Sequence, residues 1–84
     1  LRLLRDLAAE LRTRFEVVHV DAVVVAEAPR IAPRLGEVRS RLAEAIGVDV
    51  ARVNVKATTA EGLGALGRGE GIAAQAVATL SERP

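Results

Sequence analysis

Residues 53–73 carry the residue types that could bind a phosphorylated ligand. Two hydroxyl residues, Thr58 and Thr59, follow an alternating β-branched run, and a glycine-rich segment around Arg68 comes after them. Hydroxyl and guanidinium groups donate hydrogen bonds to phosphate oxygens, and glycines let a ligand approach the backbone closely. Glu61 places a carboxylate among these donors, where it would repel an anion. A divalent cation bridging that carboxylate and phosphate oxygens would resolve the conflict.

The glycine spacing alone does not identify a nucleotide site. The segment lacks the GK[ST] ending of a P-loop, and it is unlike the Rossmann GxGxxG pattern that follows a strand and opens a helix. On spacing alone, a phosphate-binding loop and an ordinary turn-rich connection both remain open.

Length and composition indicate one small domain with a thin core. The chain has 84 residues, and a chain of this size buries only about 60% of its unfolded surface. Half of the residues are hydrophobic, but Phe15 is the single aromatic, so Ala, Val, Leu and Ile supply the apolar volume. This composition predicts burial against another subunit or against a further part of the same protein. The start at Leu1, directly inside an amphipathic pattern, also suggests that the sequence has been cut.

Composition argues against several classes of partner and site. A net charge of +1 gives no signal for nucleic acid, and the absence of cysteine excludes disulfides and thiolate metal sites. No apolar run approaches the roughly 20 residues of a membrane span. Arg2, Arg5 and Asp6 interrupt the apolar core that a signal peptide would need, so a cytoplasmic location is expected.

Periodicity predicts most of the elements that must position residues 53–73. Apolar residues recur at helical spacing from the start to about residue 14, and a Val-rich run over 16–27 is typical of a buried strand. A second helix is expected from the proline-containing segment to Gly47, followed by a strand over 52–58. Strand, helix, strand with short connections predicts a right-handed βαβ unit with parallel strands.

Two further segments leave alternatives open. Residues 72–80 could form a helix or a strand buried on both faces, and the residues alone slightly favour the helix; 81–84 are expected to fray. His19 and Asp21 share one face of their strand, but two side chains do not make a metal site. Hydrogen bonding of this pair to neighbouring groups is the favoured interpretation.

The full string VNVKATT, then Glu61, then GRGEGIA resembles the C-terminal signature of the 2-C-methyl-D-erythritol 2,4-cyclodiphosphate synthase family. The resemblance covers the whole chain and corresponds to roughly the C-terminal half of a family member. It implies an α/β (α+β) fold in the order helix-strand-helix-strand-loop-strand, with a mixed β-sheet, helices on one face, and assembly into a homotrimer. Residues 1–84 would then be the C-terminal part of a single domain, and 72–80 would be a strand.

The resemblance also implies an activity. Family members are phosphorus-oxygen lyases of the non-mevalonate pathway of isoprene biosynthesis. They cyclise 4-diphosphocytidyl-methylerythritol 2-phosphate and release CMP, using zinc and a magnesium or manganese ion. The zinc ligands, an Asp-x-His motif and a further His, lie in the N-terminal half of the family's domain, whereas this sequence has only His19. Zinc is therefore expected only in the intact protein, and this chain alone is expected to be inactive.

Position by position, the resemblance assigns roles to residues in three places. Glu61 would bind magnesium or manganese, and Arg68 and Glu70 would lie near the trimer axis, where an ion pair between subunits is favoured over direct catalysis. Thr59 and Glu61 are the expected catalytic residues. The cytidine and phosphate pocket would be formed by Ala26, Pro29, Arg30, Ile31, Ala57, Thr58 and Thr59.

The sequence leaves the context and the function of the chain open. As a synthase, the chain could belong to a monofunctional enzyme or to one fused to a cytidylyltransferase. The alternatives are a non-catalytic trimeric module that binds nucleotides or phosphate, and a small α/β scaffold without a ligand.

Overall fold

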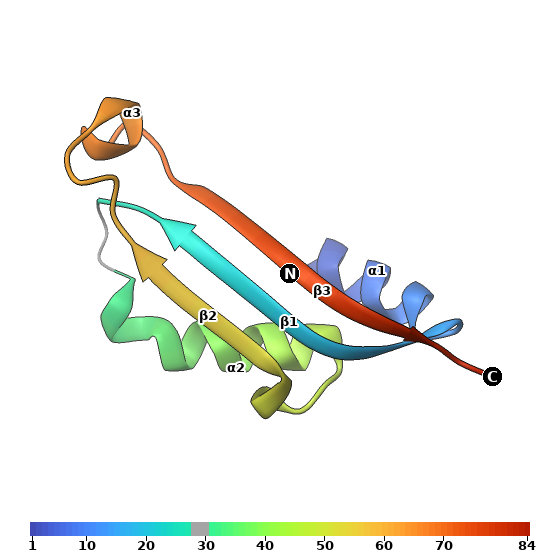
Figure 1. Ribbon diagram of the computed structural model, residues 1–84. Helices are drawn as coiled ribbons and strands as arrows, with labels where there is room; N and C mark the ends of the chain where they lie inside the picture. Colours follow the sequence, from blue (N-terminus) through green and yellow to red (C-terminus); the bar gives the residue numbers. More distant parts are fainter. Residues whose placement is uncertain (28–30) are drawn as a thin grey trace.

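The computed structural model describes residues 1–27 and 31–84. Helical segments precede each of the three strands along the chain (Figure 1). In chain order the elements are α1 (Arg2–Leu11), β1 (Phe15–Val25), the 3-10 helix η1 (Ala32–Arg34), α2 (Leu35–Ile46), the 3-10 helix η2 (Val50–Arg52), β2 (Val53–Thr58), α3 (Gly64–Gly67) and β3 (Ala73–Glu82).

The three strands form one mixed sheet in the order β2-β1-β3. Strands β1 and β2 are parallel, with Val20 opposite Val53 and Val25 opposite Thr58. This confirms the parallel strand-helix-strand unit. Strand β3 runs antiparallel to β1, and the register shifts by one residue between Val17 and His19.

The last strand settles one open choice and corrects one prediction. Residues 73–82 form a strand, as the family resemblance implied and against the slight local preference for helix. The predicted frayed tail over 81–84 is wrong in part, because β3 continues to Glu82 and pairs it with Phe15. The Arg83 N–H then donates to the Arg14 carbonyl at 2.9 Å, which holds the chain against the start of β1.

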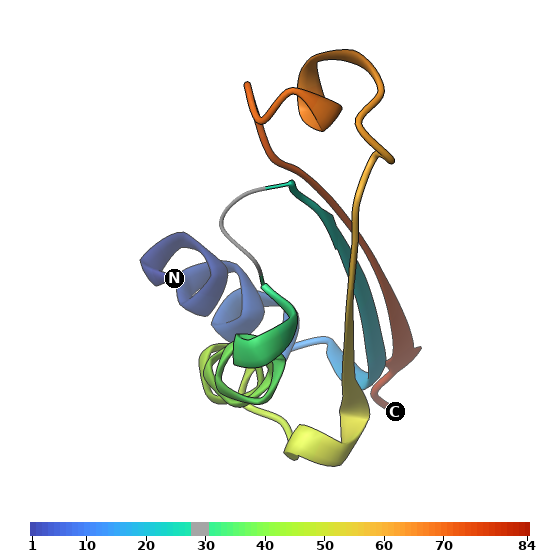
Figure 2. The same cartoon turned by 90° about the vertical axis from the view of Figure 1, so that its left-hand side faces the viewer.

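Both long helices lie on one face of the sheet, as Figure 2 shows edge-on. The core between them and the sheet is built from small aliphatic side chains, and among the residues that the structure describes only Val53 is almost completely buried, at 1% exposure. This matches the thin core expected from the composition. Its buried members are Ala8, Val17, Val20, Ala43, Ile46, Val53 and Val55.

Helix α2 ends where the sequence predicted. Gly47 adopts the left-handed conformation with φ of 83°, and its N–H donates to the Ala43 carbonyl at 2.8 Å. Glycine reaches this conformation without the steric cost that a Cβ imposes, so the helix stops and the chain turns toward β2.

The opposite face of the sheet carries no helix in the part of the chain that is described (Figure 2). Val77 of β3 is 64% exposed. Large apolar side chains are exposed on the helices as well, and Leu3 of α1 is 86% exposed. Burial of such side chains against a further subunit or a further part of the protein stays a prediction, because a single chain does not test it. Among the described residues, no helix has the length and apolar character that crossing a membrane requires.

Candidate functional site

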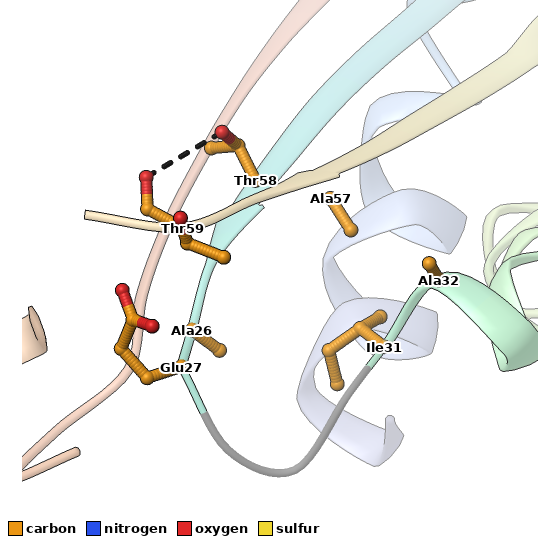
Figure 3. A pocket seen from close by; sticks show the side chains of 7 residues that line it. All are labelled: Ala26, Glu27, Ile31, Ala32, Ala57, Thr58 and Thr59. Carbon is orange, nitrogen blue, oxygen red and sulfur yellow. Dashed lines mark hydrogen bonds between the residues drawn. The ribbon is translucent and has the colours of Figure 1, made fainter. Parts of the chain in front are cut away.

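A hollow opens at the carboxyl ends of the two parallel strands. It has a volume of about 330 Å³ and lies between the end of β1, the end of β2 and the start of η1 (Figure 3). In open α/β sheets, ligands typically bind outside the carboxyl ends of parallel strands. Its lining residues are Ala26, Glu27, Ile31, Ala32, Ala57, Thr58 and Thr59.

The pairing of β1 with β2 brings the predicted residues together. The register places Val25 opposite Thr58, and just beyond it the Ala26 N–H donates to the Thr58 carbonyl at 3.1 Å. Ala26 is 7% exposed, so its small side chain forms part of the floor. Five of the residues predicted for the cytidine and phosphate pocket thus line one hollow: Ala26, Ile31, Ala57, Thr58 and Thr59. The other two, Pro29 and Arg30, lie outside the described residues.

Glu61 sits on a tight turn just after the hollow. Its φ of 56° makes it the only non-glycine residue with a left-handed backbone in the described part of the chain. The Glu61 N–H donates to the Thr59 hydroxyl oxygen at 3.2 Å, and the Leu63 N–H donates to the Ala60 carbonyl at 2.9 Å. Thr59 therefore shapes the turn as well as lining the hollow.

The glycine-rich segment contains a helix that the sequence did not predict. Helix α3 spans only four residues and packs directly on the turn, because Gly67 approaches the backbone of Gly62 closely. A Cβ on Gly67 would lie 2.1 Å from the Gly62 carbonyl carbon. The glycine at position 67 is thus required by this close approach.

Arg68 and Glu70 lie beyond α3 and do not line the hollow. The Arg68 Nε donates to the Glu70 Oε2 at 2.6 Å, and both side chains are more than half exposed. The pair therefore forms within one chain, whereas the sequence favoured a pair between subunits. Their place near a trimer axis stays a prediction.

The residues of this chain suit a magnesium ion better than a zinc ion. Within residues 1–27 and 31–84, no three His, Asp or Glu side chains gather closely enough to hold a metal ion. A structural or catalytic zinc ion needs three or four protein ligands, which these residues do not supply. Mg²⁺ commonly binds one or two carboxylates, water and substrate phosphates. The single exposed carboxylate of Glu61, beside two threonines, suits that second mode.

Two residues of the hollow were missed by the sequence analysis, Glu27 and Ala32. Glu27 directly follows Ala26, and its Oε1 accepts a hydrogen bond from the Ala60 N–H at 2.9 Å. The available signal was position alone: a carboxylate one residue beyond a predicted pocket residue, at the end of a buried strand.

Two polar clusters outside the hollow have structural explanations. On the open face of the sheet, Asp21 accepts a hydrogen bond from the Asn54 side-chain amide at 3.0 Å and pairs with Lys56 at 3.7 Å. This agrees with the expectation that Asp21 bonds to neighbouring groups. His19 lies on the same strand, opposite Thr79.

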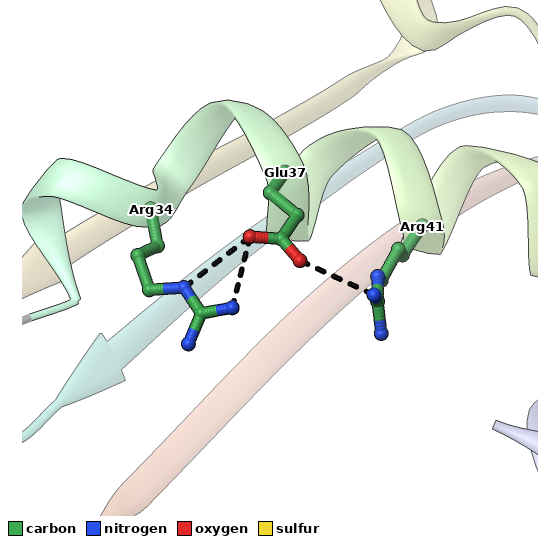
Figure 4. A network of polar contacts seen from close by, with 3 residues as sticks. All are labelled: Arg34, Glu37 and Arg41. Carbon is green, nitrogen blue, oxygen red and sulfur yellow. Dashed lines mark hydrogen bonds and ion pairs between the residues drawn. The ribbon is translucent and has the colours of Figure 1, made fainter.

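The second cluster lies at the start of α2, where Glu37 sits between two arginines (Figure 4). Its Oε2 accepts from the Arg34 Nε at 3.2 Å and Nη2 at 2.9 Å, and its Oε1 lies 3.2 Å from the Arg41 Nη2. The hydrogen bonds and the positive charge of Arg34 lower the pKa of the Glu37 carboxyl, with a smaller contribution from Arg41. Neighbours at i,i+3 and i,i+4 with an acid in the first turn stabilise a helix, so we interpret this cluster as support for α2.

Comparison with known proteins shows which family the chain resembles. The sequence model of the YgbB family matches residues 1–81. A bifunctional enzyme IspD/IspF of Anaeromyxobacter sp. (strain Fw109-5) is 57% identical over 81 residues, which are 95% of this chain and 21% of that protein. The 2-C-methyl-D-erythritol 2,4-cyclodiphosphate synthase of Laribacter hongkongensis is 52% identical over 82 residues, which are 96% of this chain and 51% of that protein.

Solved structures share the same arrangement of elements. The crystal structure of 2C-methyl-D-erythritol 2,4-cyclodiphosphate synthase from Plasmodium vivax matches with a TM-score of 0.91 and 30% identity. The match covers 96% of this chain and 55% of that one. The chain thus spans about half the length of the single-function relatives and about a fifth of the bifunctional one.

Proposed function

The chain belongs to the YgbB family, and from this premise we propose that the intact protein containing it is a 2-C-methyl-D-erythritol 2,4-cyclodiphosphate synthase. In this reaction the 2-phosphate of 4-diphosphocytidyl-methylerythritol 2-phosphate attacks the β-phosphorus. The bond from that phosphorus to the bridging oxygen breaks, and CMP leaves with this oxygen. The enzyme would be a phosphorus-oxygen lyase of isoprene biosynthesis.

One observation supports this proposal most strongly. Ala26, Ala57, Thr58 and Thr59 converge on one hollow at the ends of β1 and β2, and the Glu61 turn follows directly. Because the attacking group belongs to the substrate, the protein needs no nucleophile of its own. It must hold two anionic groups in line and offset the charge that develops between them.

Each part of the hollow has a role in that scheme. The alanines at 26 and 57 leave room for a flat base close to the strand backbones, and Ile31 offers an apolar side chain to it. The Thr58 hydroxyl lies 3.5 Å from the Thr59 carbonyl, a long and weak contact, so it is available to donate to a phosphate oxygen. Thr59 would hold the turn that carries Glu61.

Glu61 is the residue of this chain that we assign to a divalent cation. A bound Mg²⁺ or Mn²⁺ would supply positive charge to the diphosphate oxygens. The zinc site, the homotrimer and a cytoplasmic location belong to the proposal for the intact protein. In the same proposal, the 84-residue chain alone is inactive.

The test uses the intact protein with zinc and magnesium and follows CMP release and the ³¹P spectrum of the product. We expect the cyclic diphosphate and CMP in equal amounts. The matched control substrate is 4-diphosphocytidyl-methylerythritol without its 2-phosphate, which lacks the attacking group and should release no CMP. Equal release from both substrates would indicate hydrolysis and contradict the proposal. No turnover combined with a CMP-dependent rise in Tm would favour the non-catalytic binding module.

A further inference from the structure

Glu27 holds the turn on which Glu61 lies. The residue follows β1 at its carboxyl end and is half-buried, and Figure 3 places its side chain beside the hollow. Its Oε1 accepts hydrogen bonds from the Ala60 N–H at 2.9 Å and from the Gly62 N–H at 3.4 Å. The first has an ordinary length and the second is longer and weaker. One carboxylate oxygen thus binds the N–H groups on both sides of Glu61.

This position requires external support. The φ of 56° at Glu61 is disfavoured for residues with a Cβ, and such conformations persist only where the surroundings impose them. Within the turn, the Thr59 hydroxyl oxygen accepts from the Glu61 N–H. Glu27 is different because it reaches the turn from another strand, 33 residues away for Ala60. It therefore fixes the turn relative to the sheet.

The segment that carries Glu27 is also bonded to the strand end that lines the hollow. Ala26, the neighbour of Glu27, donates its N–H to the Thr58 carbonyl at 3.1 Å. The end of β1 therefore bonds to the chain both before the turn, at Thr58, and within it, at Ala60 and Gly62. A carboxylate at position 61 that must meet a cation and phosphate oxygens benefits from this double attachment.

We propose that Glu27 is a positioning residue, which sets the location of the Glu61 carboxylate by accepting both flanking N–H groups. This inference rests on the proposed function, since it assigns Glu27 to the same reaction. The role needs an acceptor at the correct reach and does not need a negative charge. A glutamine offers a carbonyl oxygen at the same place, whereas aspartate keeps the charge but is shorter by one methylene.

The experiment compares Glu27→Gln, Glu27→Asp and Glu27→Ala in the intact protein. The first readout is amide hydrogen exchange at Ala60 and Gly62, which needs no turnover. We expect exchange to rise about tenfold in the Ala and Asp variants and to stay near the wild-type rate in the Gln variant. Glu44→Ala is the matched control, because this exposed glutamate of α2 only pairs weakly with Arg5 at 3.7 Å.

The second readout is kinetic. Glu27→Ala should lower kcat about tenfold, raise the Mg²⁺ concentration needed for half-maximal rate and leave KM within about twofold, because the carboxylate is displaced while the base pocket is intact. Glu27→Gln should keep kcat and the Mg²⁺ concentration for half-maximal rate near their wild-type values. A substitution that merely weakened the fold would lower the rate at every Mg²⁺ concentration and would leave the concentration for half-maximal rate unchanged.

Three results would overturn the inference. Unchanged exchange and unchanged kcat in Glu27→Ala would show that the two hydrogen bonds do not matter, while an active wild type would leave the proposed function standing. A Gln variant as defective as the Ala variant would show that the charge is used instead of the acceptor. An intact wild type without turnover would remove the proposed function, and with it the assignment of Glu27 to that reaction.

Discussion

Replacement of Gly67 by alanine tests how closely α3 must pack on the turn that carries Glu61. The new Cβ would lie 2.1 Å from the carbonyl carbon of Gly62, 2.7 Å from its Cα and 2.8 Å from its oxygen. These are backbone atoms, which cannot rotate away as a side chain could. The separation must grow from 2.1 Å to the 3.4 Å at which contact becomes ordinary, about 1.3 Å, and Glu61 is the next residue to move.

The size of that displacement sets the expected effect. Overpacking of this kind costs about 1–3 kcal/mol, which exceeds the roughly 1 kcal/mol that alanine offers over glycine in a helix. Because α3 has no buried residue, the strain can be relieved locally, and we expect only a small fall in Tm. A misplacement of about 1 Å at a catalytic group can cost about 100-fold. We therefore expect Gly67→Ala to lower kcat by one to two orders of magnitude.

The assay is steady-state CMP release by the intact protein, with Tm measured alongside. Gly36→Ala is the matched control, because nothing lies within 4 Å of a Cβ at that position in α2. It should keep the wild-type kcat and should not lower Tm. A Gly67→Ala variant with wild-type kcat would refute the reasoning, since it would mean that the turn tolerates the displacement or does not position the reacting groups.

Two further predictions concern the threonines and the Glu37 cluster. Replacing both Thr58 and Thr59 by valine should weaken diphosphate binding about 10-fold or more, since each lost hydrogen bond is worth about 0.5–1.5 kcal/mol. Calorimetric titration with CDP measures this, and equal affinities would count against the threonines as phosphate ligands. Glu37→Gln should reduce the loss of Tm on acidification. Because the pKa of Glu37 is lower in the folded chain than its usual 4.5, its stabilisation is present above that value and is lost as the pH falls through the lower folded pKa. Identical Tm profiles of the wild type and the variant from pH 7 to pH 3 would show that the ion pairs of Glu37 with Arg34 and Arg41 do not contribute to the loss of stability in acid.

The elements with a clear sequence period were predicted, and those without one were not. The helix that ends at Gly47 and the parallel strands β1 and β2 follow from apolar spacing and a glycine stop. Helix α3 was missed because four residues rich in glycine show no helical period. Strand β3 was ambiguous, since its many alanines fit either state, and its pairing with β1 decides the outcome.

The residues of the site were also predicted only in part. Thr58 is the last residue of a predicted strand, and Thr59 and Glu61 follow it, so their residue types were informative before the fold was known. Their convergence with Ala26 depends on the register between two strands, which the residues alone do not specify and the family resemblance supplied. Glu27 was missed because its partners are 33 and 35 residues away, and no local pattern marks a side chain that bonds to distant backbone groups.

The most direct test of the proposed chemistry is the turnover of Glu61→Gln compared with its affinity for CMP, both measured on the intact protein. The change keeps the shape of the side chain and removes the charge that would hold a cation on the diphosphate. We expect kcat to fall by about 100-fold or more, while the Kd for CMP stays within about twofold of the wild-type value. A variant with unchanged turnover would contradict the account, because Glu61 would then have no part in the reaction.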